Sequence, residues 1–251
     1  MKRLVLWMSA VLLVCSAPAV LAAQVTVLSA GAIEPGIRPA LAAFEKASGH
    51  TVVLTFATAP QIRQRIGAGE TFDMVIAPPA VLDELEKATK VGTVRAAIGR
   101  VGIGVAVRPG AALPDISNAE AVKRAVLDAD SLVFNRASTG LYFEGLLKKM
   151  GLDGQALPKS TRYPDGASVM EHVLHGKGRE IGFGAITEIV LLQGKGLQLV
   201  GPLPPDLQNL TAYAATPTRA QPGSEVQALM KHLASAETRA GLAAAGIDQG
   251  P

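Results

Sequence analysis

Cysteine and aromatic residues are scarce in this chain of 251 residues, and each scarcity excludes a class of site. Cys15 is the single cysteine, and it lies in an N-terminal segment typical of a removable leader. The remaining chain can therefore form no internal disulfide and no thiolate metal centre. Phe, Trp and Tyr together make up 4% of the residues, which disfavours a sugar-stacking surface. Without disulfides the chain must rely on its core, and it is long enough to bury one or two substantial ones.

Motifs of the familiar catalytic centres are also missing. The sequence contains no G-x-S-x-G turn, H-E-x-x-H pair, phosphate loop or dinucleotide fingerprint, and the G-x-x-G-x-G at Gly99–Gly104 lies inside a strand pattern. His172 and His175 have a spacing that can bind metal, but no cysteine is available and the other histidines, His50 and His232, lie far off in sequence. We therefore expect no catalytic residue, no metal site, no cofactor and no enzymatic activity. A periplasmic enzyme on the same scaffold stays open as an alternative, which turnover of a bound ligand would reveal.

Residues 1–23 are predicted to be a secretory signal peptide. Two basic residues precede an apolar core from Leu4 to Val14, and small residues around Ala22 offer a cleavage site. This core is too short to span a bilayer, which takes about 20 residues, and Pro18 interrupts it. The bulk of Val14 before Cys15 argues against lipoprotein processing. We expect a periplasmic protein released by cleavage.

The charge of the chain indicates no nucleic-acid partner. Its formal net charge of +3 falls to +1 when the leader is removed, because the leader carries Lys2 and Arg3 and no acidic residue. No run of basic residues interleaved with aromatics is left in the remaining chain. We therefore expect no nucleic-acid partner, and a monomer.

Alternating strand and helix patterns predict an α/β fold. Short apolar runs are followed by segments with apolar residues on one helical face, as Ile33, Ile37, Leu41 and Phe44 show after the first run. Such alternation predicts mostly parallel sheets with helices on both faces. The expected strands are residues 25–28, 51–56, 72–77, 99–107, 131–134, 181–185, 197–200 and 210–215, and two closing helices are expected near 224–234 and 237–245.

Four strand-to-helix junctions contain small or polar residues that suit anion binding. The first is Ser29–Ala32, and similar junctions follow at 57–61, 136–140 and 166–168. Backbone N–H groups at a helix start can hold an anion without a charged side chain. If two lobes face each other, these junctions point into one cleft. The candidate ligand-binding residues are Ser29, Ala30, Gly31, Ala32, Thr58, Ala59, Arg136, Ser138 and Thr139.

Two of these candidates have an equally good structural explanation. Thr58 and Gln61 have capping-box spacing, so Thr58 is either a helix cap or a ligand contact. Arg136 is either a carboxylate-binding fork in the cleft or a surface ion pair. If Arg136 binds a carboxylate ligand, replacing it with Ala should abolish that binding.

Two local stretches carry a resemblance to a known family. The segment Phe56–Gly69 (FATAPQIRQRIGAG), followed by Phe72–Ala77 (FDMVIA), resembles type II periplasmic binding proteins, specifically the molybdate-binding components of ABC transporters. The resemblance extends over nearly the whole mature chain. It implies two lobes, each a mixed and mostly parallel sheet flanked by helices, joined by crossings near Val105 and Leu210. Lobe 1 would comprise residues 24–104 and 212–251, and lobe 2 residues 105–211.

The same resemblance implies a function. A small anion would bind in the interlobe cleft, where the residues before Ile62 and near Thr139 contact it. The lobes would close by a hinge, and the closed form would dock on a membrane permease. Molybdate or tungstate is the ligand of the family, for uptake by an ABC importer.

Departures from the family pattern keep other ligands open. Ala32 and Ala59 stand where molybdate binders have serine, and Ala185 falls where they have a tyrosine. Arg136 adds a charge that a neutral oxyanion cage does not need. These changes favour a small organic carboxylate as the alternative ligand, for uptake or for sensing.

Overall fold

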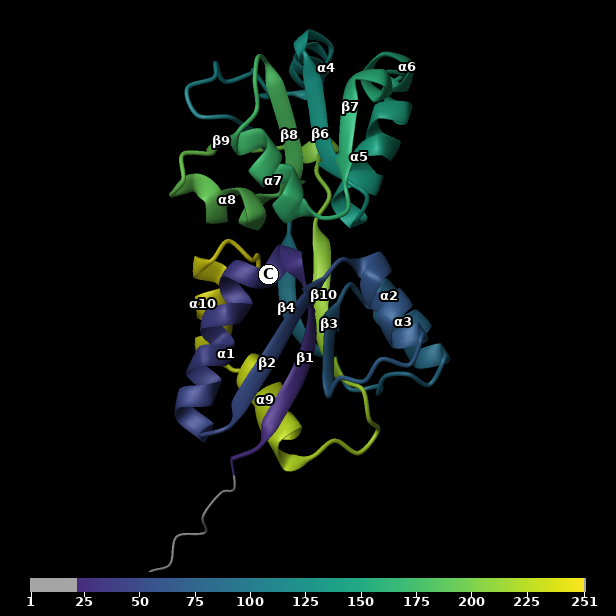
Figure 1. The fold of residues 1–251 in the computed structure, drawn as a ribbon, viewed down its shortest axis with the longest axis vertical. Helices are drawn as coiled ribbons and strands as arrows, with labels where there is room; N and C mark the ends of the chain where they lie inside the picture. The colour runs from purple at the N-terminus through teal and green to yellow at the C-terminus, as the bar shows by residue number, and fades with distance from the viewer. Residues whose placement is uncertain (1–21, 251) are drawn as a thin grey trace, which may run out of the picture.

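Two lobes form the part of the chain that the structure, a computed structural model, describes: residues 22–250 (Figure 1). Residues 1–21, which include most of the expected signal peptide, and residue 251 lie outside it. No helix within the described range is long and apolar enough to cross a membrane. The expected two-lobed α/β fold is confirmed, with one five-stranded mixed sheet in each lobe.

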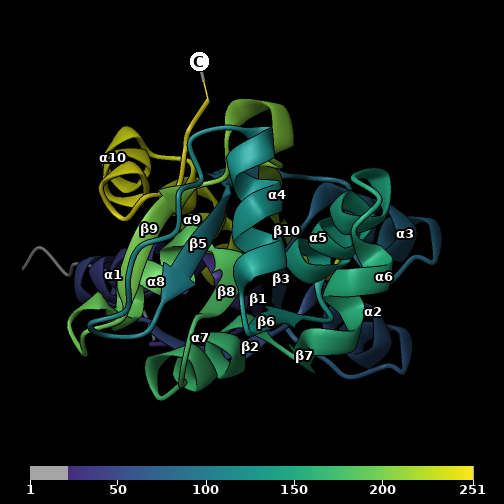
Figure 2. The ribbon, with the colours of Figure 1, turned by 90° about the horizontal axis from the view of Figure 1, so that it is seen from above.

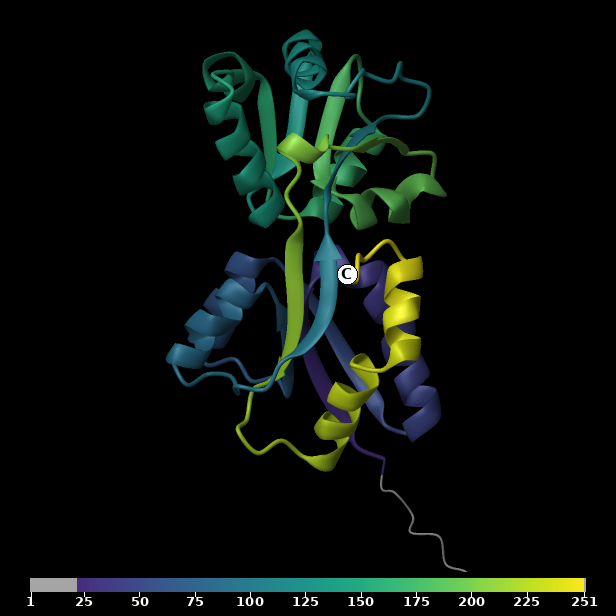
Figure 3. The ribbon, with the colours of Figure 1, turned by 180° about the vertical axis from the view of Figure 1, so that it is seen from behind.

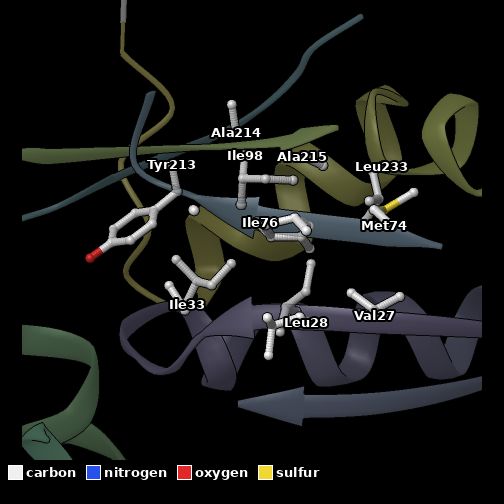
Figure 4. Packing of buried hydrophobic residues seen from close by; sticks show 14 of the residues in the cluster. Val27, Leu28, Ile33, Met74, Ile76, Ile98, Tyr213, Ala214, Ala215 and Leu233 are labelled. Atoms are coloured by element: carbon white, nitrogen blue, oxygen red, sulfur yellow. The ribbon is translucent and has the colours of Figure 1, made fainter. Parts of the chain in front are cut away.

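The first lobe is built on a sheet of strand order β2-β1-β3-β10-β4, in which β1 pairs in parallel with β2 and β3, and β10 runs antiparallel to its neighbours. Its elements are β1 (Gln24–Ala30), η1 (Gly31–Ile33), α1 (Glu34–Ser48), β2 (Thr51–Ala57), α2 (Ala59–Gly67), β3 (Met74–Ala77), α3 (Pro79–Lys87), β4 (Ala96–Val101), β10 (Thr211–Pro217), α9 (Ser224–Leu233) and α10 (Ala236–Ala244). Val27, Leu28, Ile76 and Ile98 pack with Leu233 in its core (Figure 4).

The second lobe repeats this design with the order β7-β6-β8-β5-β9, in which β6 pairs in parallel with β7 and β8. Its elements are β5 (Ile103–Val107), α4 (Ala119–Asp128), β6 (Ser131–Asn135), α5 (Ser138–Lys149), α6 (Asp153–Ala156), η2 (Leu157–Lys159), β7 (Ser160–Tyr163), α7 (Gly166–Leu174), β8 (Glu180–Ala185), α8 (Ile186–Gln193), β9 (Gln198–Pro202) and η3 (Pro205–Leu207).

Both faces of the second sheet are covered by helices, as the view from above shows (Figure 2). Ile103, Val105 and Val107 of β5 belong to the cluster under α4 and α5, whereas Ala106 belongs to the cluster under α7 and α8. This is the two-residue alternation of a strand buried on both sides. The rings of Phe143 and Phe183 stack in the first of these clusters, with centroids 3.8 Å apart.

The chain passes between the lobes at two places that lie side by side (Figure 3). It leaves the first sheet after Val101 and enters the second at Ile103, and it returns between η3 and Thr211. Ile103 and Gly104, assigned to lobe 1 from the sequence, therefore pair within the second sheet. The Gln208 side chain joins the two crossings, because it accepts the Ile103 N–H at 2.7 Å and donates to the Ile103 carbonyl at 3.0 Å.

The expectation of one strand over residues 99–107 is wrong, because two strands in different sheets occupy that segment. Gly102 separates them, and a Cβ there would lie 3.3 Å from atoms of Gln208 and Leu210 in the returning segment. Gly99 has φ +133°, and a Cβ there would lie 2.6 Å from Ile247 and 2.7 Å from the Asp248 carbonyl. The glycines therefore allow close approach of other chain segments and not an uninterrupted strand.

Candidate functional site

A pocket of about 510 Å³ lies between the lobes, where the carboxyl ends of parallel strands from both sheets face each other. All four junctions singled out in the sequence contribute to it. Its lining residues are Ala30, Gly31, Ala32, Glu34, Pro35, Phe56, Ala57, Thr58, Ala59, Gln61, Asn135, Ala137, Ser138, Thr139, Asp165, Gly166, Ala167, Ser168, Glu171, Glu188, Leu191, Leu192 and Tyr213. No lysine, arginine or histidine is among these described residues.

Backbone N–H groups at helix starts are the pocket groups that are suited to an anion. At the start of α5 the Asn135 carboxamide accepts the N–H groups of Ala137 and Gly140, at 3.0 and 2.9 Å. The N–H groups of Ser138 and Thr139 lie in the first helical turn and have no intrahelical acceptor. They are thus available to a ligand.

The starts of α2 and α7 are arranged in the same way. Gln61 Oε1 accepts hydrogen bonds from the Thr58 N–H at 2.8 Å and from the Thr58 hydroxyl at 3.0 Å. Thr58 therefore takes part in helix capping and also lines the pocket. At α7 the Asp165 carboxylate accepts the Ser168 N–H at 2.8 Å. The N–H groups of Gly166 and Ala167 remain in the first turn.

Seven of the nine ligand-binding candidates line the pocket, and the other two do not. Ser29 is fully buried, and its hydroxyl donates to the Ala30 carbonyl at 3.2 Å. Arg136 is exposed and lies outside the lining, and its backbone N–H donates to the Tyr163 carbonyl at 2.8 Å, directly after the pairing of β6 with β7. The pocket lining therefore contains neither the Arg136 guanidinium nor the Ser29 hydroxyl, both of which the sequence pattern placed in the cleft.

Glu188 is a pocket residue that sequence reasoning missed. It lies in the first turn of α8, directly after β8, at a fifth junction of the same strand-to-helix kind. The pKa of the Glu188 carboxyl is raised to about 7, chiefly by burial and to a lesser extent by the negative charges of Asp165 and Glu34, while a hydrogen bond from the Ala185 backbone lowers it. Glu188 can thus gain or lose a proton near neutral pH.

Gly166 makes room for this carboxyl group. A Cβ on Gly166 would fall 1.9 Å from Glu188 Oε2, and one on Gly31 would stand 3.9 Å from Oε1. The Glu188 carboxyl therefore lies against the backbone of the α7 start, between the two lobes.

Two hydrogen bonds hold α8 against the first lobe. Thr187, which is fully buried, donates its hydroxyl to the Ala32 carbonyl at 2.5 Å. The Ile186 N–H donates to the Gly102 carbonyl at 3.0 Å, at the crossing between the lobes. The position of Glu188 therefore depends on how the lobes are arranged.

Glu188→Gln is expected to stabilise the protein at pH 8 and to leave its stability nearly unchanged at pH 4. A carboxyl whose pKa is raised on folding binds its proton more tightly in the folded chain, so wild-type stability falls as pH rises from about 4.5 to about 7. The difference should reach about 1 to 3 kcal/mol, allowing for the partial solvent access of this side chain. Thermal unfolding of both proteins at several pH values measures it. Glu237→Gln, an exposed carboxyl in the first turn of α10, should show no such pH-dependent gain.

Comparison with known proteins places this geometry in a family. The family model described as bacterial extracellular solute-binding protein matches residues 25–248. An aconitate isomerase from Pseudomonas sp. is 32% identical over 96% of this chain and 94% of its own length.

Solved structures share the fold at low sequence identity. The periplasmic molybdate-binding protein of Azotobacter vinelandii has a TM-score of 0.73 and 15% identity, with 90% of this chain and all of that chain covered. A tungstate ABC transporter structure from Geobacter sulfurreducens has a TM-score of 0.66 and 14% identity over 88% of this chain and 98% of its own. These likenesses establish the fold.

The expectation that the chain is not an enzyme is overturned by the isomerase relative. That expectation rested on the missing nucleophile–base pair. Proton-transfer chemistry needs a positioned acid or base and no nucleophile, so the absent motifs do not exclude it. Glu188 is a group of the required kind.

Proposed function

This chain belongs to the bacterial extracellular solute-binding proteins, and we propose that its interlobe pocket binds a small organic polycarboxylate and isomerises it by proton transfer. The observation that carries the proposal is Glu188, a carboxyl with a pKa of about 7 that lies against the start of α7 inside the interlobe pocket. Capture and release of a solute need no such base. Proton transfer does.

The pocket walls support a carboxylate ligand. Backbone N–H groups from helix starts of both lobes can donate hydrogen bonds to several carboxylates at once. The volume of about 510 Å³ falls in the range of sites for organic ligands, and Phe56, Leu191 and Leu192 add apolar surface for a carbon skeleton. Aconitate, named in the relative, has three carboxylates around one carbon–carbon double bond.

The reaction can be written with Glu188 alone as the proton carrier. The Glu188 carboxylate takes a proton from the methylene carbon of aconitate, and the C–H electron pair delocalises over the allylic carbons and the adjacent carboxylate. When the protonated Glu188 returns the proton to the far carbon, the double bond has moved. Because the skeleton is unchanged by this shift, the product is aconitate again, as the cis or the trans form. No oxidant or reductant is required.

Incubation with cis-aconitate in D₂O, followed by proton NMR, tests the proposal. We expect the trans isomer to form and deuterium to enter the methylene position, because the proton on Glu188 exchanges with solvent. Absence of both isomerisation and exchange over a range of pH from 6 to 9 would contradict the proposed activity.

Capture of a tetrahedral oxyanion for an ABC importer is the second candidate function. Two observations favour it. The helix starts that line the pocket offer backbone N–H groups without any cationic side chain, and the fold is shared with molybdate and tungstate proteins. In this case the chain is exported by residues 1–23 and delivers its anion to a membrane permease. A thermal-shift screen of molybdate and tungstate against tricarboxylates separates the two candidates. A ligand at a hundred times its Kd should add about 2.7 kcal/mol of stability.

A further inference from the structure

Tyr213 is a pocket residue whose hydroxyl makes no hydrogen bond to the described part of the protein. It lies on β10, directly after the chain returns to the first lobe, at a point where the pairing of β10 with β4 shifts in register. Its side chain is 6% exposed and belongs to the core cluster of the first lobe. Figure 4 shows its hydroxyl oxygen pointing away from the aliphatic side chains around it.

The Tyr213 hydroxyl has no hydrogen-bond partner among the described residues, whereas the other two tyrosines have one. Tyr142 donates to the Leu207 carbonyl at 3.2 Å, and the Tyr163 hydroxyl lies 2.6 Å from His172 Nδ1. The ring of Tyr213 is buried, but its hydroxyl is not among the enclosed polar atoms that lack a partner. It opens on the interlobe pocket, where a bound ligand can accept its hydrogen bond.

Tyr213 and Glu188 approach the pocket from different lobes. Burial raises the pKa of the Tyr213 hydroxyl, and the negative charge of Glu188 raises it further. Tyr213 therefore stays protonated at neutral pH and can act only as a donor to an anionic ligand. A ligand between the lobes meets a base on α8 and a neutral donor on β10.

We propose that the Tyr213 hydroxyl donates a hydrogen bond to the ligand carboxylate next to the carbon that Glu188 deprotonates, an assignment that rests on the proposed isomerisation. When the C–H bond breaks, its proton goes to Glu188 and negative charge grows on that carboxylate. A donor placed in advance at this oxygen stabilises the charged intermediate more than the ground state. Tyr213 transfers no proton in this scheme.

The test is Tyr213→Phe, with Tyr142→Phe as the matched control. Both variants remove one hydroxyl, but only Tyr142 loses a bond to the protein, so Tyr213→Phe should keep the wild-type Tm. We expect Tyr213→Phe to lower kcat for aconitate by about 10- to 100-fold. Its Kd for propane-1,2,3-tricarboxylate, a saturated analogue that cannot isomerise, should rise several-fold by calorimetry. Tyr142→Phe should change neither value by more than twofold.

The other outcomes would overturn the role of Tyr213, the proposed isomerisation, or both. An unchanged kcat and Kd in Tyr213→Phe overturns the role of Tyr213, and so does an equal loss in Tyr142→Phe. If the wild type binds the saturated tricarboxylate but does not isomerise aconitate, the proposed activity fails, and the Kd of Tyr213→Phe alone then decides whether Tyr213 contacts the ligand. If the wild type binds no tricarboxylate, both proposals fail.

Discussion

Replacing Glu188 with Gln is expected to lower the isomerisation of aconitate by about 10²- to 10⁴-fold, the usual contribution of a positioned general base. The carboxamide has nearly the same shape but cannot take a proton from carbon. Binding of propane-1,2,3-tricarboxylate should persist or tighten at pH 8, because the substitution removes a negative charge that Glu34 and Asp165 already disfavour. Stopped assays for turnover and calorimetry for binding measure the two effects separately.

The pH dependence of the wild type adds an independent check on Glu188. Since the base must be ionised to act, kcat/KM should rise with pH through about 7, the pKa of the free protein. Glu237→Gln should keep the wild-type rate and pH profile, because that carboxyl is exposed on α10 and outside the pocket lining. Wild-type turnover in Glu188→Gln would exclude Glu188 as the base.

Replacing Gly140 with Ala is expected to destabilise the protein by about 3 kcal/mol or more and to weaken ligand binding. A Cβ at this position would lie 1.7 Å from the Asn135 carbonyl oxygen, which is backbone and cannot move away cheaply. The start of α5 must shift to relieve this contact. That shift also disturbs the bond from the Gly140 N–H to the Asn135 carboxamide and the N–H groups offered to the ligand.

Gly145→Ala on the same helix is the matched control. A Cβ there meets no atom within 4 Å. An alanine in a helix interior is favoured over glycine by roughly 0.5 to 1 kcal/mol, so this variant should be slightly more stable than the wild type. Chemical denaturation of the three proteins gives both differences. Equal stability of Gly140→Ala and Gly145→Ala would mean that the α5 start adapts without cost.

Local patterns were sufficient for most of the fold and for part of the site. The strand-to-helix order predicted an α/β fold, and the family resemblance implied its two lobes. The junctions at Ala30–Ala32, Thr58–Ala59 and Ser138–Thr139 all line the pocket. These junctions are recognisable because their chemistry is local: small residues end a strand, and the next helix starts with open N–H groups. The break at Gly102 between two strands could not be recognised from the sequence. It depends on Gln208 and Leu210 of the returning segment, which pack against Gly102 from more than 100 positions away.

The two proposed catalytic residues, Glu188 and Tyr213, cannot be recognised from sequence patterns alone. Helix α8 (ITEIVLLQ) is apolar around most of its circumference, so it lacks the one-sided periodicity that identifies a surface helix. The sequence pattern therefore does not place Glu188 at a strand-to-helix junction. Tyr213 sits in a strand that forms part of the crossing, and nothing in its neighbours indicates that its hydroxyl is left without a partner.

The sequence by itself determined the alternation of elements, the four junctions that start helices, and the family, because these depend on neighbouring residues or on their order. Only the tertiary structure decided which side chains face the ligand. It left Arg136 exposed and outside the pocket lining, buried Ser29, and brought Glu188 from one lobe to the same pocket as Tyr213 from the other. The pKa of Glu188 is raised by burial and by acids from two lobes, and such an environment exists only after the chain has folded.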